Sequence, residues 1–237
     1  SKKIYSLIDW EYFLERDFEN IIHSNRSYAK HCQIGNLFNL INFSCSITIP
    51  ELYECSKLDF SNNKCNLEQV LKKLYILDNL KTLHLVNNKI EVVPKELLKI
   101  TNLTQLSFKH NKISKISSEI CKLVNLRTLS FGKNRIKVLP KELGLLSCLE
   151  RLVLFDNKIK VLPEELCLLT SLRDLDLQQN LIEKITKKIN LLTNLRKLEL
   201  GKNNIKYLPT ELYSLTNLQE LNISYNKTVI VKEFSLL

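Results

Sequence analysis

The chain has 237 residues, of which 44% are hydrophobic, and its 35 lysines and arginines outnumber its 25 acidic residues, for a net charge of +10. The hydrophobic fraction is ordinary for one sizeable folded domain, which argues against a disordered chain. No apolar run is long enough for a membrane span, so we expect no membrane insertion. The positive charge favours an acidic partner, although abundant lysine and asparagine beside a single alanine are also typical of an AT-rich genome.

Residues 1–36 are predicted to form an N-terminal helical cap. Between residues 4 and 22, apolar side chains recur at helical spacing, and acids such as Glu11 and Glu15 weigh against a helix on an anionic membrane surface. The stretch is also too charged for a secretory signal. At the other end, residues 227–237 are expected to be a C-terminal cap or a truncated repeat, because the repeat pattern lapses there.

A repeat of 23 residues fills the chain between these two ends. Each unit follows the frame LxxLxLxxNxIxxLPxELxxLxNL and opens with a leucine at the same offset: Leu80, Leu103, Leu126, Leu149, Leu172, Leu195 and Leu218. A fixed period of this length indicates a solenoid of stacked coils. Residues 37–226 are therefore predicted to hold about eight coils, the first two of them degenerate.

The frame predicts the path of each coil. The LxL alternation is typical of a short strand with its leucines inward. The asparagine that follows, such as Asn134 or Asn157, can bond the turning backbone because an amide both donates and accepts. The Leu-Pro pair favours an extended return, and ELxxL a short helix or turn. The expected fold class is α/β, a right-handed solenoid with a parallel sheet on the concave face and short helices or turns on the convex face.

With these motifs the chain resembles the leucine-rich repeat family. The nearest resemblance is to its intracellular 23-residue LPxEL subclass, as in Ras-pathway scaffolds and deadenylase subunits, and the strong match covers residues 80–226. The resemblance implies a non-catalytic scaffold or regulatory subunit that binds another protein on the concave face, as part of a larger complex.

Residues that could support chemistry are sparse. The seven cysteines include no CxxC pair and have no histidine at metal-ligand spacing, so we expect no metal site and a reducing compartment, either the cytoplasm or the nucleus. With four histidines and four glycines, the chain offers neither a nucleophile–base pair nor a phosphate-binding loop. We therefore expect no enzyme activity and no cofactor.

The outward strand positions are the candidate protein-binding surface. Val153 and Phe155 are apolar where solvent-facing residues are expected, with Arg151 beside them, and Gly132 on the preceding coil is expected to leave room for something to approach Phe155. A lone surface aromatic without a function is the alternative interpretation. The predicted set also contains Lys109, Arg127, Ser130, Asp174, Asp176 and Glu199. Its acids would either orient a basic partner or form a solvated mesh of ion pairs.

A second candidate surface, the basic edge, follows the asparagines. It consists of Lys112, Arg135, Lys137, Lys158 and Lys160. Like charges on neighbouring coils repel one another, and a phosphate chain or an acidic protein segment would relieve the repulsion. The basic edge supports the second hypothesis, an RNA- or ribosome-associated protein. Lysine side chains that simply splay apart in water are the other interpretation.

Overall fold

A computed structural model describes residues 52, 54–62 and 67–227. The predicted cap of residues 1–36 lies outside this part of the chain, and so do residues 228–237 of the predicted C-terminal segment. Most of the first degenerate coil is also outside it. The domain boundaries therefore stay predictions.

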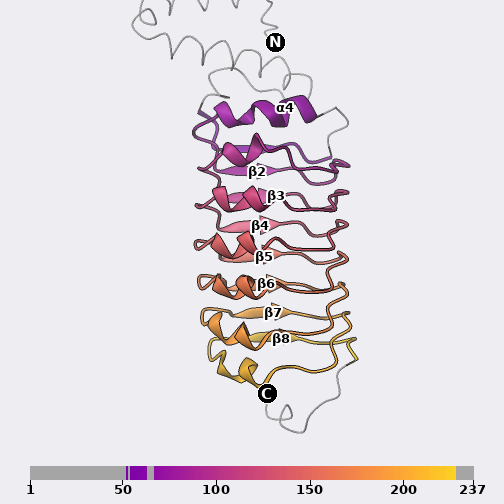
Figure 1. The fold of residues 1–237 in the computed structure, drawn as a ribbon. Helices are drawn as coiled ribbons and strands as arrows, with labels where there is room; N and C mark the ends of the chain where they lie inside the picture. The colour runs from indigo at the N-terminus through magenta and orange to yellow at the C-terminus, as the bar shows by residue number, and fades with distance from the viewer. Residues whose placement is uncertain (1–51, 53, 63–66, 228–237) are drawn as a thin grey trace, which may run out of the picture.

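One sheet of eight parallel strands runs through the described coils in chain order (Figure 1). Each strand has three residues and pairs in register with the next, so that its central leucine lies beside the central leucine of its neighbour. The strands are β1 (Lys57–Asp59), β2 (Thr82–His84), β3 (Gln105–Ser107), β4 (Thr128–Ser130), β5 (Arg151–Val153), β6 (Asp174–Asp176), β7 (Lys197–Glu199) and β8 (Glu220–Asn222).

Short helices form a column of their own beside the strands (Figure 1). They are α4 (Glu68–Lys73) and the 3-10 helices η1 (Leu74–Ile76), η2 (Leu97–Lys99), η3 (Ser118–Lys122), η4 (Lys141–Leu145), η5 (Glu164–Leu168), η6 (Lys187–Leu191) and η7 (Thr210–Ser214). Leucines of the strands and leucines of the helices, such as Leu143 and Leu166, are buried in one continuous cluster. The hydrophobic core therefore lies between the sheet and the helices, and the predicted fold class is confirmed.

The start of each five-residue 3-10 helix is set in one of two ways. Pro140, Pro163 and Pro209 precede η4, η5 and η7, with φ angles of −69°, −64° and −70° that the proline ring already imposes. Where proline is missing, a hydroxyl takes over: Ser117 accepts a hydrogen bond from the Glu119 N–H, and Thr186 accepts one from the Lys188 N–H. The LPxEL motif and its Ser/Thr variants thus produce the same local structure.

The predicted asparagine ladder is confirmed. The Asn157 Nδ2 donates to the carbonyl oxygens of Phe131, 2.9 Å away on the preceding coil, and Leu154, 3.0 Å away on its own coil. Its Oδ1 accepts from the Ile136 N–H at 2.9 Å. The same pattern recurs at Asn111, Asn134, Asn180, Asn203 and Asn226. Each amide therefore ties its coil to the one before it.

Burial along the strands fixes which side chains are available to a partner. The central leucine is buried in β1 to β7, and the residues on either side of it are mostly half-buried or exposed. We call the sheet face the surface formed by the first and third residues of β1 to β8 and by the second residue beyond each strand, such as Phe155. It corresponds to the face predicted as concave.

Candidate functional site

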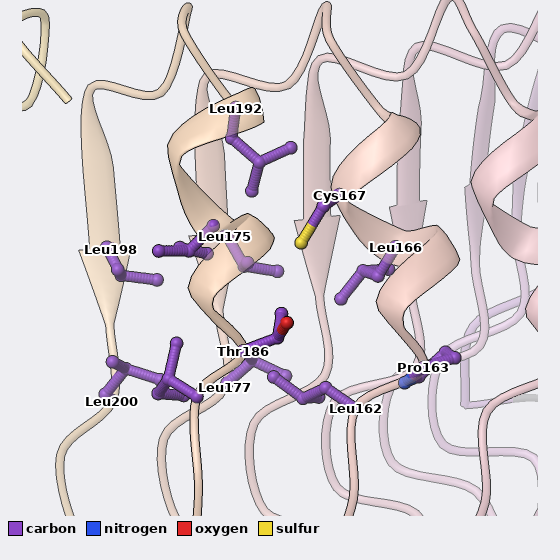
Figure 2. A pocket seen from close by; sticks show the side chains of 12 residues that line it. Leu162, Pro163, Leu166, Cys167, Leu175, Leu177, Thr186, Leu192, Leu198 and Leu200 are labelled. Atoms are coloured by element: carbon purple, nitrogen blue, oxygen red, sulfur yellow. The ribbon is translucent and has the colours of Figure 1, made fainter. Parts of the chain in front are cut away.

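Within the described coils, the best-formed cavity is small and apolar. It lies between η5, η6 and the strands beneath them, with a volume of about 10 Å³. Apolar side chains such as Leu166, Leu175 and Leu198 line it almost wholly (Figure 2). A cavity of this size holds at most about one water, and an apolar lining keeps it dry. Among the residues that the structure describes, no group of three or more histidine, cysteine or acidic side chains could hold a metal ion. The candidate site is therefore on the surface.

Phe155 is the centre of the aromatic part of the sheet face. Its ring lies across Gly132 of the preceding coil, since a Cβ placed on Gly132 would stand 2.3 Å from the Phe155 Cε1. The prediction that Gly132 leaves room for a partner beside Phe155 was wrong, because the ring of Phe155 itself fills that room. Lys109, two coils earlier, holds its Nζ 5.2 Å from the ring centroid in a cation–π contact.

The neighbours of Phe155 differ in how much surface they offer. Val153 is half-buried beside Ser130, its register partner on β4, and Ser130 is only 9% exposed. Arg127 and Arg151 are exposed, but each is held by an acid on the following coil. Arg127 forms an ion pair with Glu150, and the Arg151 Nε lies 3.1 Å from the Asp174 Oδ2. The predicted residues therefore lie on or directly beside β3 to β7, with Ser130 contributing almost no surface.

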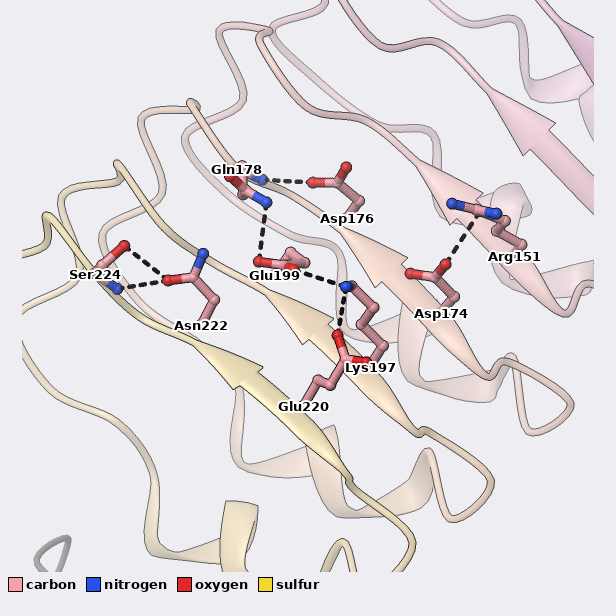
Figure 3. Close-up of polar contacts among 9 residues, drawn as sticks. All are labelled: Arg151, Asp174, Asp176, Gln178, Lys197, Glu199, Glu220, Asn222 and Ser224. Carbon is pink, nitrogen blue, oxygen red and sulfur yellow. Dashed lines mark hydrogen bonds and ion pairs between the residues drawn. The ribbon is translucent and has the colours of Figure 1, made fainter. Parts of the chain in front are cut away.

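The acidic residues of the sheet face are connected to their neighbours (Figure 3). The Lys197 Nζ lies 3.2 Å from the Glu199 Oε1 and also pairs with Glu220. The other carboxylate oxygen of Glu199 accepts from the Gln178 Nε2 at 2.9 Å. Of the two interpretations left open by the sequence, the mesh of ion pairs is the arrangement observed. A role in orienting a basic partner is not tested by it.

Asp176 stands apart within this mesh. Its Oδ1 accepts a hydrogen bond from the backbone N–H of Gln178 at 3.1 Å. Burial raises the pKa of the Asp176 carboxyl, and the nearby carboxylates of Glu199 and Asp174 raise it further, against the opposing effects of the Gln178 N–H and Arg151. Such a shift occurs both at functional sites and within structural ion-pair networks.

The basic edge lies beyond the sheet, on the loops that follow the asparagine turns. Arg135, Lys137, Lys158 and Lys160 are exposed, and no ion pair is found for them within residues 52, 54–62 and 67–227. Lys112 differs, because it is half-buried and its Nζ lies 3.9 Å from the Glu91 Oε1. The predicted edge is therefore strongest on two coils, those of residues 126–148 and 149–171.

Sequence reasoning missed Glu150. This half-buried carboxylate pairs with Arg127 on the preceding coil and lies 4.0 Å from the Arg173 Nη1 on the following one. The signal was present in the sequence, since Arg127, Glu150 and Arg173 occupy one position of three successive repeats. Alternating charges in one column of a solenoid predict ion pairs between coils.

No helix in the described part of the chain has the length and apolar character needed to cross a membrane. The described coils define a solenoid that presents variable side chains on an open sheet. A family model described as leucine-rich repeat region matches residues 36–181 and 115–237. The chain belongs to the leucine-rich repeat family.

Solved structures support the same assignment. A leucine-rich repeat protein of Leptospira interrogans, LIC12759, is 36% identical over 70% of this chain and 42% of its own, with a TM-score of 0.67. Internalin C2 of Listeria monocytogenes is 24% identical over 86% of this chain and 88% of its own, with a TM-score of 0.69. The plant peptide hormone receptor RGFR1, solved in complex with RGF2, is 26% identical over 66% of this chain and 30% of its own, with a TM-score of 0.57.

The chain spans less than half of the Leptospira protein and less than a third of the plant receptor. A comparison with curated proteins found no match.

Proposed function

We propose that the protein is a non-catalytic interaction scaffold, a regulatory subunit of a larger complex, and that it binds another protein on the sheet face around Phe155. The observation that carries this proposal is the half-buried ring of Phe155, which packs on Gly132 and contacts Lys109, flanked by the exposed Arg127 and Arg151. Aromatic and arginine side chains dominate the binding energy of protein interfaces.

Rigidity supports the same surface. The backbone beneath Phe155 is fixed by the ladder of Asn134 and Asn157, and the ring is held between Gly132 and the Lys109 ammonium. A preorganised surface loses little conformational entropy when a partner binds. One relative, the receptor RGFR1, was solved in complex with RGF2, so this fold is compatible with holding a separate molecule.

We place the protein in the cytoplasm, with the nucleus as the alternative. The described cysteines Cys55, Cys121, Cys148 and Cys167 are free thiols, as is usual in a reducing compartment. Burial raises the pKa of Cys55 and of Cys167 to about 11, which keeps both thiols protonated and unreactive near neutral pH. Because the similar structures include a hormone receptor, membership of the family does not by itself fix the compartment.

The test compares proteins captured from a native lysate by the wild-type chain, by Phe155→Ser and by Tyr207→Ser, with and without nuclease. Tyr207 is the matched control, because it is an aromatic side chain, 65% exposed, that lies outside the sheet face. We expect a nuclease-resistant partner whose recovery falls about tenfold with Phe155→Ser, the effect of losing one interface hot spot. Tyr207→Ser should capture it normally.

Capture that is unchanged in Phe155→Ser would contradict the proposal. Complete loss of the captured material after nuclease treatment would instead favour the RNA- or ribosome-associated alternative. Circular dichroism of each variant establishes that it is folded before its capture is compared.

A further inference from the structure

Two apolar side chains lie beside the exposed cations of the basic edge. Val138 is 70% exposed and Val161 is 72% exposed, and each directly follows a lysine of the edge, Lys137 or Lys160. The two valines occupy one position of neighbouring coils. Exposure of this degree, repeated on adjacent coils next to positive charges that have no ion pair among the described residues, means that both the charge and the apolar surface are available to a partner.

Backbone geometry sets the spacing of these groups. The side chain of Ile136 is fully buried, whereas Arg135 and Lys137 on either side of it are exposed, so the two cations stand two residues apart on the exposed side of the segment. The Lys158 N–H donates to the Ile136 carbonyl oxygen at 2.8 Å and keeps the next coil alongside. An extended peptide likewise presents every second side chain on one face, at about 6.6 Å intervals.

Neighbouring coils limit the length of the surface. On one side Glu91 lies 3.9 Å from Lys112, and on the other side Glu183 occupies the position held by Lys137 and Lys160. Among the described coils, those of residues 126–148 and 149–171 are therefore the two that carry a cation at both of these positions, and a surface of two coils fits a short segment. The aromatic side chains of these coils are Phe131, which is buried, and Phe155, which belongs to the sheet face, so the edge offers no platform on which nucleic-acid bases could stack.

We propose that Arg135, Lys137, Lys158 and Lys160, with Val138 and Val161, bind a short extended segment of an acidic protein that carries an apolar side chain next to its carboxylates. The cations pair with the carboxylates, and the valines bury the apolar side chain. This site is separate from the sheet face and does not depend on the function proposed for it.

The probe is a fluorescein-labelled peptide that repeats Glu-Ser-Glu-Ser-Val-Ser, which in extended form presents two carboxylates and one valine on a single face. The control peptide, called the serine peptide, has serine in place of valine and carries the same charge. Fluorescence anisotropy at physiological salt measures the affinity of each peptide for the full chain. We expect saturable binding of the valine peptide that is at least about threefold tighter than binding of the serine peptide, as burial of one side chain predicts.

Charge reversal tests the cations. Arg135→Glu with Lys158→Glu should weaken binding of the valine peptide about tenfold, since two attractive contacts become repulsive. The matched control is Lys95→Glu with Lys141→Glu, two exposed lysines at the helix side of the coils, which changes the net charge equally and should weaken binding less than about twofold. Val138→Ser with Val161→Ser should reduce binding of the valine peptide to that of the serine peptide. Phe155→Ser should leave the affinities for the valine peptide and the serine peptide unchanged.

Three results would overturn the proposal. The first is the absence of saturable binding, and the second is an equal loss in the control charge reversal, which would show an effect of net charge alone. The third is tighter binding of a single-stranded oligonucleotide of the same charge, which would make the edge a nucleic-acid surface.

Discussion

At the scale of single residues, one amide side chain satisfies three backbone groups at every turn. Asn157 is 7% exposed, and it bonds one N–H and two carbonyl oxygens, which it shares with Asn134 and Asn180, the ladder asparagines of the neighbouring coils. A second row of asparagines is built more simply. The exposed Asn194 donates to the Thr170 carbonyl oxygen at 2.9 Å and makes no buried contact of this kind. The two rows therefore consist of the same residue type, asparagine, and differ in how deeply it is buried.

This difference predicts the result of removing each amide. Asn157→Ala should lower the free energy of unfolding by about 2 kcal/mol, because the buried Ile136 N–H loses its hydrogen-bond partner while the two carbonyl oxygens keep one donor each. Asn194→Ala should lower it by less than about 1 kcal/mol, since water replaces the lost bond. Urea unfolding followed by circular dichroism measures both. Equal losses in the two variants would show that burial of the ladder does not determine its contribution.

At the scale of elements, the packing of η4 against η5 depends on Gly144. A Cβ at this position would stand 2.0 Å from the carbonyl oxygen of Glu165 in η5. Backbone atoms cannot move aside as a side chain can, so the two helices would have to separate. At Gly132, in contrast, the three atoms nearest to an added Cβ all belong to the ring of Phe155, which can rotate on its own χ angles.

Replacing each glycine by alanine therefore gives different outcomes. We expect Gly144→Ala to lower the free energy of unfolding by about 2 kcal/mol, the usual effect of overpacking. Gly132→Ala should lower it by less than about 1 kcal/mol, while displacing Phe155 from its position under Lys109. Thermal and urea unfolding of the two variants make the comparison, and a larger loss for Gly132→Ala would contradict the packing argument.

At the scale of the whole molecule, the coils depend on their immediate neighbours. Strands pair only with the next strand in the chain, and each ladder asparagine reaches back a single coil. The stability of such a solenoid is approximately a sum over coils and the interfaces between them. Within the described coils, one complete unit can therefore be removed without changing the register of the rest.

Deletion of residues 149–171 is the corresponding experiment, because Leu172 would then follow Cys148 as Leu149 now does. We expect a cooperatively folded protein whose urea m-value is lower by about one eighth, since one strand of eight and its coil are lost. Deletion of residues 149–160 removes about half a coil and should prevent folding, because it breaks the register. If the half-coil deletion unfolded as cooperatively as the full one, nearest-neighbour stacking would not describe this protein.

The amino-acid sequence by itself determined the solenoid, the parallel strands and the asparagine ladder, because each of these follows from which residues recur every 23 positions. It also placed Val153 and Phe155 on the strand positions that turn outward. Repetition fixes the face of a coil on which a side chain lies, since the backbone path is the same in every unit.

Only the tertiary structure decided what those side chains contact. Phe155 closes over Gly132, Glu150 joins the arginines of two coils, and Val138 remains exposed beside Lys137. The physical reason is that a rotamer is chosen among several staggered positions by the neighbours it meets. Here those neighbours lie a whole coil away along the chain, where the repeat pattern specifies the position of a residue but not the direction of its side chain.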